Sequence, residues 1–216
     1  MKKGAIFDMD GLMFDTERLY QELWNEVAGD MGITLSKEFA KEIGGSTGDL
    51  LRSVVVRHFH TDDPDGIFAR VLEEARIRLK TSVPLKPGLF EILDFFKENH
   101  LTLAVASSSP IEIIRSNLRV SGCESYFDRV ISGHFLKRGK PAPDVFLYAA
   151  DEIRLSPSDC YVLEDSVNGV LAGLAAGCTT IMVPDCTPPA SELYEKGAKI
   201  CSSLLEAKER IENGEF

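Results

Sequence analysis

The sequence predicts an α/β protein with a doubly wound parallel sheet and a helical subdomain inserted after the first strand. Three observations predict this fold. Short apolar runs alternate with helical patterns over residues 88–183, a separate apolar run opens the chain, and a long stretch without strand character lies between them. At 216 residues, the chain is long enough for one domain that carries such an insertion.

Five short apolar runs have the composition of strands that are buried on both faces of a parallel sheet. They are Gly4–Asp8, Thr102–Ser107, Arg129–Ser132, Tyr161–Glu164 and Thr179–Val183. Helical patterns separate the last four runs, at Pro110–Arg119, Pro143–Ile153 and Ser166–Ala176. This alternation predicts a doubly wound, Rossmann-like sheet. The tail Lys196–Glu215 is predicted to form a final strand and a solvated helix.

The segment from Asp15 to about Val83 is rich in helix-forming residues instead. Its apolar residues recur at helical spacing: Leu19, Leu23, Val27; Leu50, Leu51, Val54, Val55; Phe68, Val71, Leu72, Ala75, Leu79. Trp24 belongs on or beside the first stripe, which favours a place in the core. The turn-forming run 84–88, Pro-Leu-Lys-Pro-Gly, marks the return to the sheet. We therefore expect a core domain of residues 1–14 and 85–216 and a helical cap domain of residues 15–84.

Composition restricts the class of partner. The net charge of -10 argues against nucleic acid or an anionic membrane surface, because both repel an acidic protein. A small phosphorylated ligand stays possible, since a metal ion and one lysine can reverse the charge locally. Asp8 and Asp10 interrupt the apolar start too early for a signal peptide. The five cysteines are scattered, without a Cys-x-x-Cys pair, which favours reduced thiols and a cytoplasmic location.

Asp8 and Asp10 follow the first apolar run directly. In open α/β sheets, ligands bind in the crevice outside the carboxyl ends of the strands. Burial of two carboxylates there is unfavourable unless a cation or a proton compensates. An isolated Asp-x-Asp-Gly would more often be a solvated turn, but the apolar strand before it favours a site.

Polar residues also follow three other predicted strands. Ser107, Ser108 and Ser109 form a hydroxyl-rich turn that could hold an anion at a helix start, Lys140 lies between a glycine and a proline, and Glu164-Asp165 is a second acidic pair. Singly, these residues fit a helix cap, a surface lysine or a turn. Together, at the ends of strands in one sheet, they predict a binding site.

In this order, these segments closely resemble the four motifs of the haloacid dehalogenase superfamily, and the resemblance extends to the helical insertion. It implies that Asp8 is a nucleophile and Asp10 a general acid and base. It further implies that Ser107, with Ser108 beside it, and Lys140 bind the transferring phosphoryl group. The chemistry agrees, because phosphoryl transfer requires an in-line nucleophile and neutralisation of the equatorial oxygens.

The same resemblance implies a Mg²⁺ cofactor. Its ligands would be the Asp8 carboxylate, the Asp10 backbone carbonyl, and Asp165 with Glu164 close by. Mg²⁺ prefers oxygen ligands and retains several waters, which suits such an acidic cluster. Superfamily members that cleave carbon–halogen bonds lack an aspartate at the second position. Asp10 therefore indicates phosphate-ester hydrolysis or phosphoryl transfer between sugar hydroxyls.

Two groups within the superfamily are most similar. Enzymes like β-phosphoglucomutase carry histidine, lysine and arginine where this chain has Tyr20, Gly44 and Gly48, so a mutase is the alternative rather than the first prediction. The runs Asp15–Tyr20 and Met182–Asp185 resemble phosphatases that act on pseudouridine 5′-phosphate. We expect a monomeric phosphatase of small phosphorylated metabolites, such as sugar or nucleoside phosphates. A non-catalytic protein that binds a phosphorylated ligand is the alternative from another class.

Overall fold

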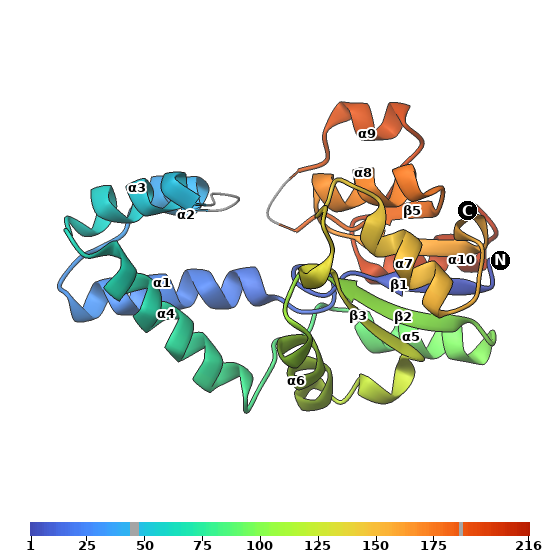
Figure 1. The fold of residues 1–216 in the computed structure, drawn as a ribbon, viewed down its shortest axis with the longest axis horizontal. Coiled ribbons are helices and arrows are strands. Elements are labelled where there is room, and N and C mark those ends of the chain that lie inside the picture. Colours follow the sequence, from blue (N-terminus) through green and yellow to red (C-terminus); the bar gives the residue numbers. More distant parts are fainter. Residues whose placement is uncertain (44–47, 186–187) are drawn as a thin grey trace. The chain divides into compact units, whose positions relative to one another are not determined.

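The computed structural model describes residues 1–43, 48–185 and 188–216, and the chain divides into two compact units (Figure 1). One unit comprises Met1–Asp15 and Val83–Phe216 and contains the sheet; the other, Thr16–Ser82, is helical. Of the three positions compared with the mutases, Gly44 lies outside the described residues, and Gly48 begins helix α3. No helix in the described part of the chain is long and apolar enough to cross a membrane.

The sheet has six strands within the described residues, and every pair of neighbours is parallel. The strands are β1 (Gly4–Phe7), β2 (Thr102–Ser107), β3 (Arg129–Ser132), β4 (Cys160–Glu164), β5 (Thr179–Met182) and β6 (Lys199–Ile200). Their spatial order is 3-2-1-4-5-6, the order of a doubly wound Rossmann-like sheet. The predicted fold class is confirmed, and the five predicted runs match their strands to within about one residue at either end.

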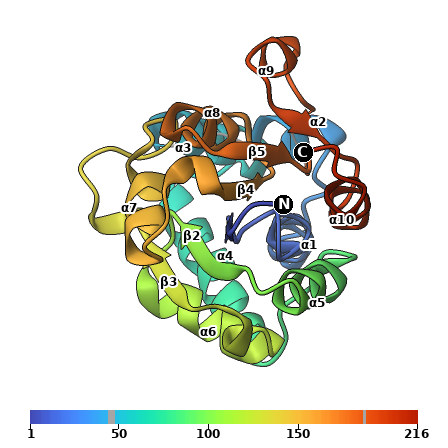
Figure 2. The same cartoon turned by 90° about the vertical axis from the view of Figure 1, so that its right-hand side faces the viewer.

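Helices cover both faces of this sheet. They are α5 (Leu89–Glu98), α6 (Ile111–Ser121), α7 (Asp144–Glu152), α8 (Val167–Ala176), α9 (Ser191–Glu195) and α10 (Leu204–Glu212), with 3-10 turns at Glu124–Tyr126, Gly133–Phe135 and Pro157–Asp159. α7 and α8 lie on one face, and α5, α6 and α10 on the other (Figure 2). Helices α5 and α9 were not among the predicted elements. The last strand and the last helix lie within the predicted tail.

The central strands are buried on both faces, as their apolar composition requires. Ile6 and Val162 belong to a cluster with Phe146 of α7. On the opposite face, Phe96 of α5 packs edge-on against Phe7 at 5.9 Å between ring centroids and stacks on Tyr161 at 6.0 Å. Strands β1 and β4 are thus packed on both faces, which fixes the positions of their carboxyl ends.

The helical unit has an apolar core of its own. It consists of α1 (Thr16–Asp30), α2 (Lys37–Ile43), α3 (Gly48–Phe59) and α4 (Pro64–Leu79). Trp24 is buried, with the rings of Phe39, Phe59 and Phe68 within 6 Å of its own, and its predicted core location is confirmed. Leu50 and Leu72 lie on the predicted apolar stripes, yet both are exposed.

The two segments that join the insertion to the sheet-bearing unit run side by side. The Asp15 amide donates to the Pro84 carbonyl and the Lys86 amide to the Met13 carbonyl, each at 2.9 Å. The Lys86 ammonium also contacts the carboxylates of Asp15 and Asp185. The insertion therefore begins and ends at one place in the fold, directly after the turn that carries Asp8 and Asp10.

Candidate active site

Strand register brings the acidic residues together at the carboxyl edge of the sheet. Phe7 pairs with Leu163 of β4, and the Asp8 amide continues the ladder by donating to the Leu163 carbonyl at 3.0 Å. Asp8 therefore follows β1 at the level where Glu164 ends β4. Both side chains are buried, with 6% and 1% of their residues' surfaces exposed. A charge at this depth requires compensation.

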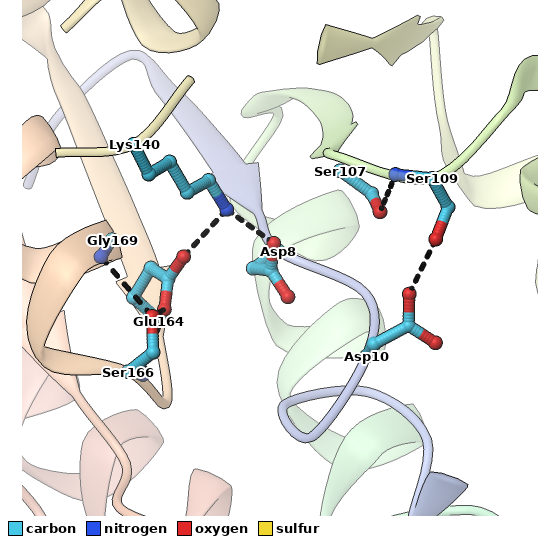
Figure 3. Close-up of polar contacts among 8 residues, drawn as sticks. All are labelled: Asp8, Asp10, Ser107, Ser109, Lys140, Glu164, Ser166 and Gly169. Carbon is cyan, nitrogen blue, oxygen red and sulfur yellow. Dashed lines mark hydrogen bonds and ion pairs between the residues drawn. The ribbon is translucent and has the colours of Figure 1, made fainter. Parts of the chain in front are cut away.

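Lys140 supplies part of that compensation. Its ammonium contacts Asp8 Oδ1 and lies 2.6 Å from Glu164 Oε1, bridging the two carboxylates (Figure 3). The side chain is 10% exposed, and the Phe146 ring centroid lies 5.0 Å from Nζ. The lysine thus comes from the loop before α7 and reaches across the ends of β4 and β1.

Burial and charge shift the titration of this cluster. Burial raises the pKa of the Asp8 carboxyl, and Glu164 adds to the increase, although Lys140 opposes it. Burial also raises the pKa of Asp165, which lies near the negative charges of Asp8 and Glu164. Burial disfavours the Lys140 ammonium, yet the two adjacent carboxylates outweigh this and raise its pKa. The ammonium contacts only two of these three neighbouring carboxyl groups, so the site favours an additional cation.

The donor set fits a magnesium ion. Asp8, Glu164 and Asp165 can each offer a carboxylate oxygen, with these atoms within 4.8 Å of one another. All the donors are oxygens, which is the preference of Mg²⁺. Gly11 makes room for this arrangement: its φ is +82°, and a side-chain carbon there would collide with the Asp165 carboxylate. Within the described residues, no other group of acidic, histidine or cysteine side chains converges in this way.

The serines after β2 differ in their surroundings. Ser107 is buried, and its Oγ accepts a hydrogen bond from the Ser109 amide at 3.0 Å. A hydroxyl that accepts through its oxygen keeps its proton for donation to a ligand. Ser108, predicted to share phosphate binding, is exposed. Ser109 donates from Oγ to Asp10 Oδ2 at 2.9 Å (Figure 3).

Sequence reasoning did not assign three residues that shape the site. Ser166 holds the second oxygen of Glu164, with its amide at 2.8 Å and its Oγ at 3.0 Å, while also capping α8 through the Gly169 amide. A side-chain carbon on Gly169 would overlap the Glu164 carboxylate. The third is Ser109, which was predicted only as part of the turn that could hold an anion and not as a partner of Asp10. For Ser166 and Gly169, the sequence indicated only that a helix begins after the acidic pair. This pattern does not predict that either residue contacts Glu164.

Comparison with known proteins identifies the family. A family model described as haloacid dehalogenase-like hydrolase matches residues 2–177. The chain belongs to this family. This haloacid dehalogenase-like hydrolase carries the acidic pairs, the serine and the lysine of the four predicted motifs at one edge of its sheet. The predicted superfamily is confirmed.

The relatives of this hydrolase are named as phosphatases, which supports the predicted enzyme class. Hexitol phosphatase B of Escherichia coli is 32% identical over 186 residues, covering 84% of this chain and 83% of its own. A probable pseudouridine-5′-phosphatase of Drosophila melanogaster is 33% identical over 187 residues, covering 84% of this chain and 81% of its own. A crystal structure of a Thermotoga maritima protein assigned as a β-phosphoglucomutase has a TM-score of 0.85 at 29% identity, covering 98% of this chain and 99% of that one.

Proposed function

We propose that the chain is a Mg²⁺-dependent phosphatase that hydrolyses small phosphorylated metabolites, such as sugar or nucleoside phosphates, through an aspartyl-phosphate on Asp8. The observation that carries this proposal is the buried Asp8 carboxylate, held by Lys140 beside a cluster of oxygen donors. The names of the relatives support the same class of substrate, since they include a hexitol phosphatase and a pseudouridine-5′-phosphatase.

The proposed reaction has two steps. A carboxylate oxygen of Asp8 attacks phosphorus, the bond to the leaving oxygen breaks, and the Asp10 carboxyl gives its proton to that oxygen. Water then attacks the phosphorus of the aspartyl-phosphate and loses a proton to Asp10, which releases phosphate and regenerates Asp8. Ser107 and Lys140 would hold the phosphoryl oxygens through a hydroxyl and an ammonium. Bound Mg²⁺, held by Asp8, the Asp10 carbonyl and Asp165 with Glu164, would neutralise charge on the phosphoryl group.

The experiment is turnover of p-nitrophenyl phosphate and a panel of sugar, polyol and nucleoside phosphates by the purified protein, with and without Mg²⁺. We expect activity that EDTA abolishes, that Mg²⁺ restores, and that Ca²⁺ restores poorly because its looser coordination would misplace Asp8. Full activity after exhaustive EDTA treatment would rule out the metal. Binding of phosphorylated ligands without turnover would favour the non-catalytic alternative.

A phosphosugar mutase is the second candidate, because one similar crystal structure is assigned as a β-phosphoglucomutase. We favour hydrolysis, since Tyr20, Gly44 and Gly48 stand where those mutases carry basic residues, and a second phosphate would be held weakly without them. Conversion of β-glucose 1-phosphate to glucose 6-phosphate, faster than release of phosphate, would establish the mutase instead.

We also propose that the enzyme works as a monomer in a reducing compartment such as the cytoplasm, and not on nucleic acid or a membrane. The four cysteines in the described ranges, Cys123, Cys160, Cys178 and Cys201, are buried free thiols. Burial raises the pKa of each thiol. Thiols of this kind are inert structural groups rather than reactive ones.

A further inference from the structure

The hydrogen bond between Ser109 and Asp10 has no role in the two steps above. The Ser109 hydroxyl donates to Asp10 Oδ2 at 2.9 Å, and the two side chains point toward each other from the turns that follow β2 and β1 (Figure 3). We propose that Ser109 is a positioning residue, which holds the Asp10 carboxyl in the orientation needed for proton transfer. This inference rests on the proposed function, in which Asp10 is the general acid and base.

Ser109 is itself fixed through its backbone. Its amide donates to Ser107 Oγ at 3.0 Å, and its carbonyl accepts from Ser132 Oγ at 2.6 Å. Ser132 is buried at the end of β3, and its Oγ also accepts from the His134 amide at 3.2 Å. Because contacts to β2 and β3 hold the backbone of Ser109, its hydroxyl offers Asp10 a fixed partner although it lies in a turn.

The direction of the hydrogen bond suits both steps of the reaction. Asp10 Oδ2 accepts from Ser109, and an oxygen of a carboxyl group can do so whether the group is ionised or carries a proton on its other oxygen. We assign the transferred proton to Oδ1, both when it is delivered to the leaving oxygen and when it is later taken from water. The hydrogen bond also holds the Asp10 side chain in one rotamer. General acid–base catalysis requires the carboxyl to lie within hydrogen-bond distance of the group that gives or takes the proton.

A leaving-group series separates this role from a merely structural one. The variants are Ser109→Ala, Ser109→Thr as the hydroxyl-retaining rescue, and Ser121→Ala as the matched control. Ser121 also lies in this unit, at the far end of α6, and bonds a backbone carbonyl through its hydroxyl. The substrates are acetyl phosphate, whose leaving group needs little protonation, and phenyl phosphate, whose leaving group needs more.

For Ser109→Ala, we expect kcat on phenyl phosphate to fall by about ten-fold, a part of the ~10²–10⁴-fold that general acid–base catalysis contributes. KM should stay within about two-fold, because phosphate binding does not depend on proton transfer. Rapid quench with acetyl phosphate should give an unchanged rate of Asp8 phosphorylation and a longer-lived phosphoenzyme. Ser109→Thr should recover most of the activity, and Ser121→Ala should behave like the unchanged enzyme.

A double variant tests whether Ser109 acts through Asp10. Adding Ser109→Ala to Asp10→Asn should cause no further loss on phenyl phosphate, because the group that Ser109 positions is already inactive. An additional loss of similar size would overturn the proposal, as would an equal loss in the rate of Asp8 phosphorylation by both substrates in the single variant. Either result would leave the proposed function standing. Failure of the unchanged enzyme to form phosphorylated Asp8 would instead overturn the proposed function, and this role with it.

Discussion

Asp8 and Lys140 stabilise each other's charge where little water reaches. Their side chains are 9% and 10% exposed, and electrostatic attraction is stronger in such surroundings than in water. The same burial makes removal of one partner unfavourable, because the other would be left as an uncompensated charge. Asp10 lies two residues further on and faces Ser109 instead of Lys140. The two aspartates thus occupy electrostatically different places, which fits the division into nucleophile and proton carrier.

Substitutions at these aspartates should therefore have different effects. Asp8→Asn should abolish turnover, because an amide cannot form the phosphoenzyme. Asp10→Asn should keep the nucleophile and lose general acid–base catalysis, which contributes ~10²–10⁴-fold. With acetyl phosphate, Asp10→Asn should still be phosphorylated but should dephosphorylate slowly. Mass spectrometry after rapid acid quench would detect the adduct on Asp8. Wild-type turnover by Asp10→Asn without any adduct would show that these roles are wrong.

At the scale of elements, the start of α8 is shaped by the site as well as by helix stability. The helix carries glycine at position 169, although alanine favours a helix interior by about 1 kcal/mol. Glycine occurs here because the Glu164 carboxylate occupies the space that a side chain at position 169 would need. Glu164 in turn contacts Lys140, so the packing of α8 reaches Asp8 through two side chains.

Gly169→Ala should consequently lower both activity and stability. The new methyl group would displace Glu164 and disturb Lys140, and we expect kcat to fall by at least ten-fold, on the order of the loss for other displaced catalytic groups. Gly29→Ala is the matched control, because Gly29 is also helical but has open space around it. That change should leave turnover intact and add up to about 1 kcal/mol of stability. Normal turnover in Gly169→Ala would contradict the importance of this contact.

Asp128 lies directly before β3 and accepts a hydrogen bond from the start of β2, and the stabilisation from this contact should depend on pH. Burial disfavours its carboxylate, but the Leu103 amide at 2.9 Å and the Lys97 ammonium at 3.1 Å outweigh this and lower its pKa. Because the folded-state pKa is the lower one, this stabilisation is complete above the unfolded-state value, about 3.9, and is lost as pH falls through the folded-state value. In urea unfolding, Asp128→Asn should be less stable than the unchanged protein at pH 7, and the difference should shrink toward pH 3. An equal difference at both values would contradict this explanation.

At the scale of the whole molecule, each unit has its own apolar core. The buried clusters around Phe146 and around Leu193 contain residues of the sheet-bearing unit alone, and the Trp24 cluster contains only residues of the insertion. The two segments that join the insertion to the sheet-bearing unit, at Asp15 and Val83, lie next to each other. The Asp15 amide donates a hydrogen bond to the Pro84 carbonyl. A short linker could therefore span the gap that removal of the insertion leaves.

A chain in which a short Gly-Ser linker replaces residues 16–82 should fold cooperatively. Its melting temperature should rise on addition of Mg²⁺, since the acidic cluster lies entirely within the remaining unit. We also expect acetyl phosphate to phosphorylate Asp8 in this shortened chain. Calorimetry with and without Mg²⁺ would test the first expectation, and mass spectrometry the second. A broad, non-cooperative transition would show that the sheet-bearing unit depends on the insertion for its fold.

Local patterns predicted much of this molecule. Apolar runs identified the strands, and the positions of Asp8, Lys140 and Asp165 after strands predicted a binding site. The roles of these residues were implied by the resemblance to the superfamily. The contacts of Ser109 and Ser166 were not predictable, because they depend on turn geometry and rotamers that no local pattern encodes. Helix α9 is only five residues long, too short for a periodic signal. Leu72 was assigned to an apolar stripe, yet it is exposed, since periodicity does not show where a helix's packing partner ends.

The position of β1 in the sheet also determines the order in which this protein can fold during synthesis. β1 is translated before its hydrogen-bonding partners, β2 and β4, and the whole insertion is translated before either partner. The helical unit is continuous in sequence, so all of its core residues are available while β1 still lacks a neighbour. We expect the insertion to fold first on the nascent chain. Asp8 would meet Glu164 and Asp165 only once β4 has emerged, so the candidate active site would be assembled late.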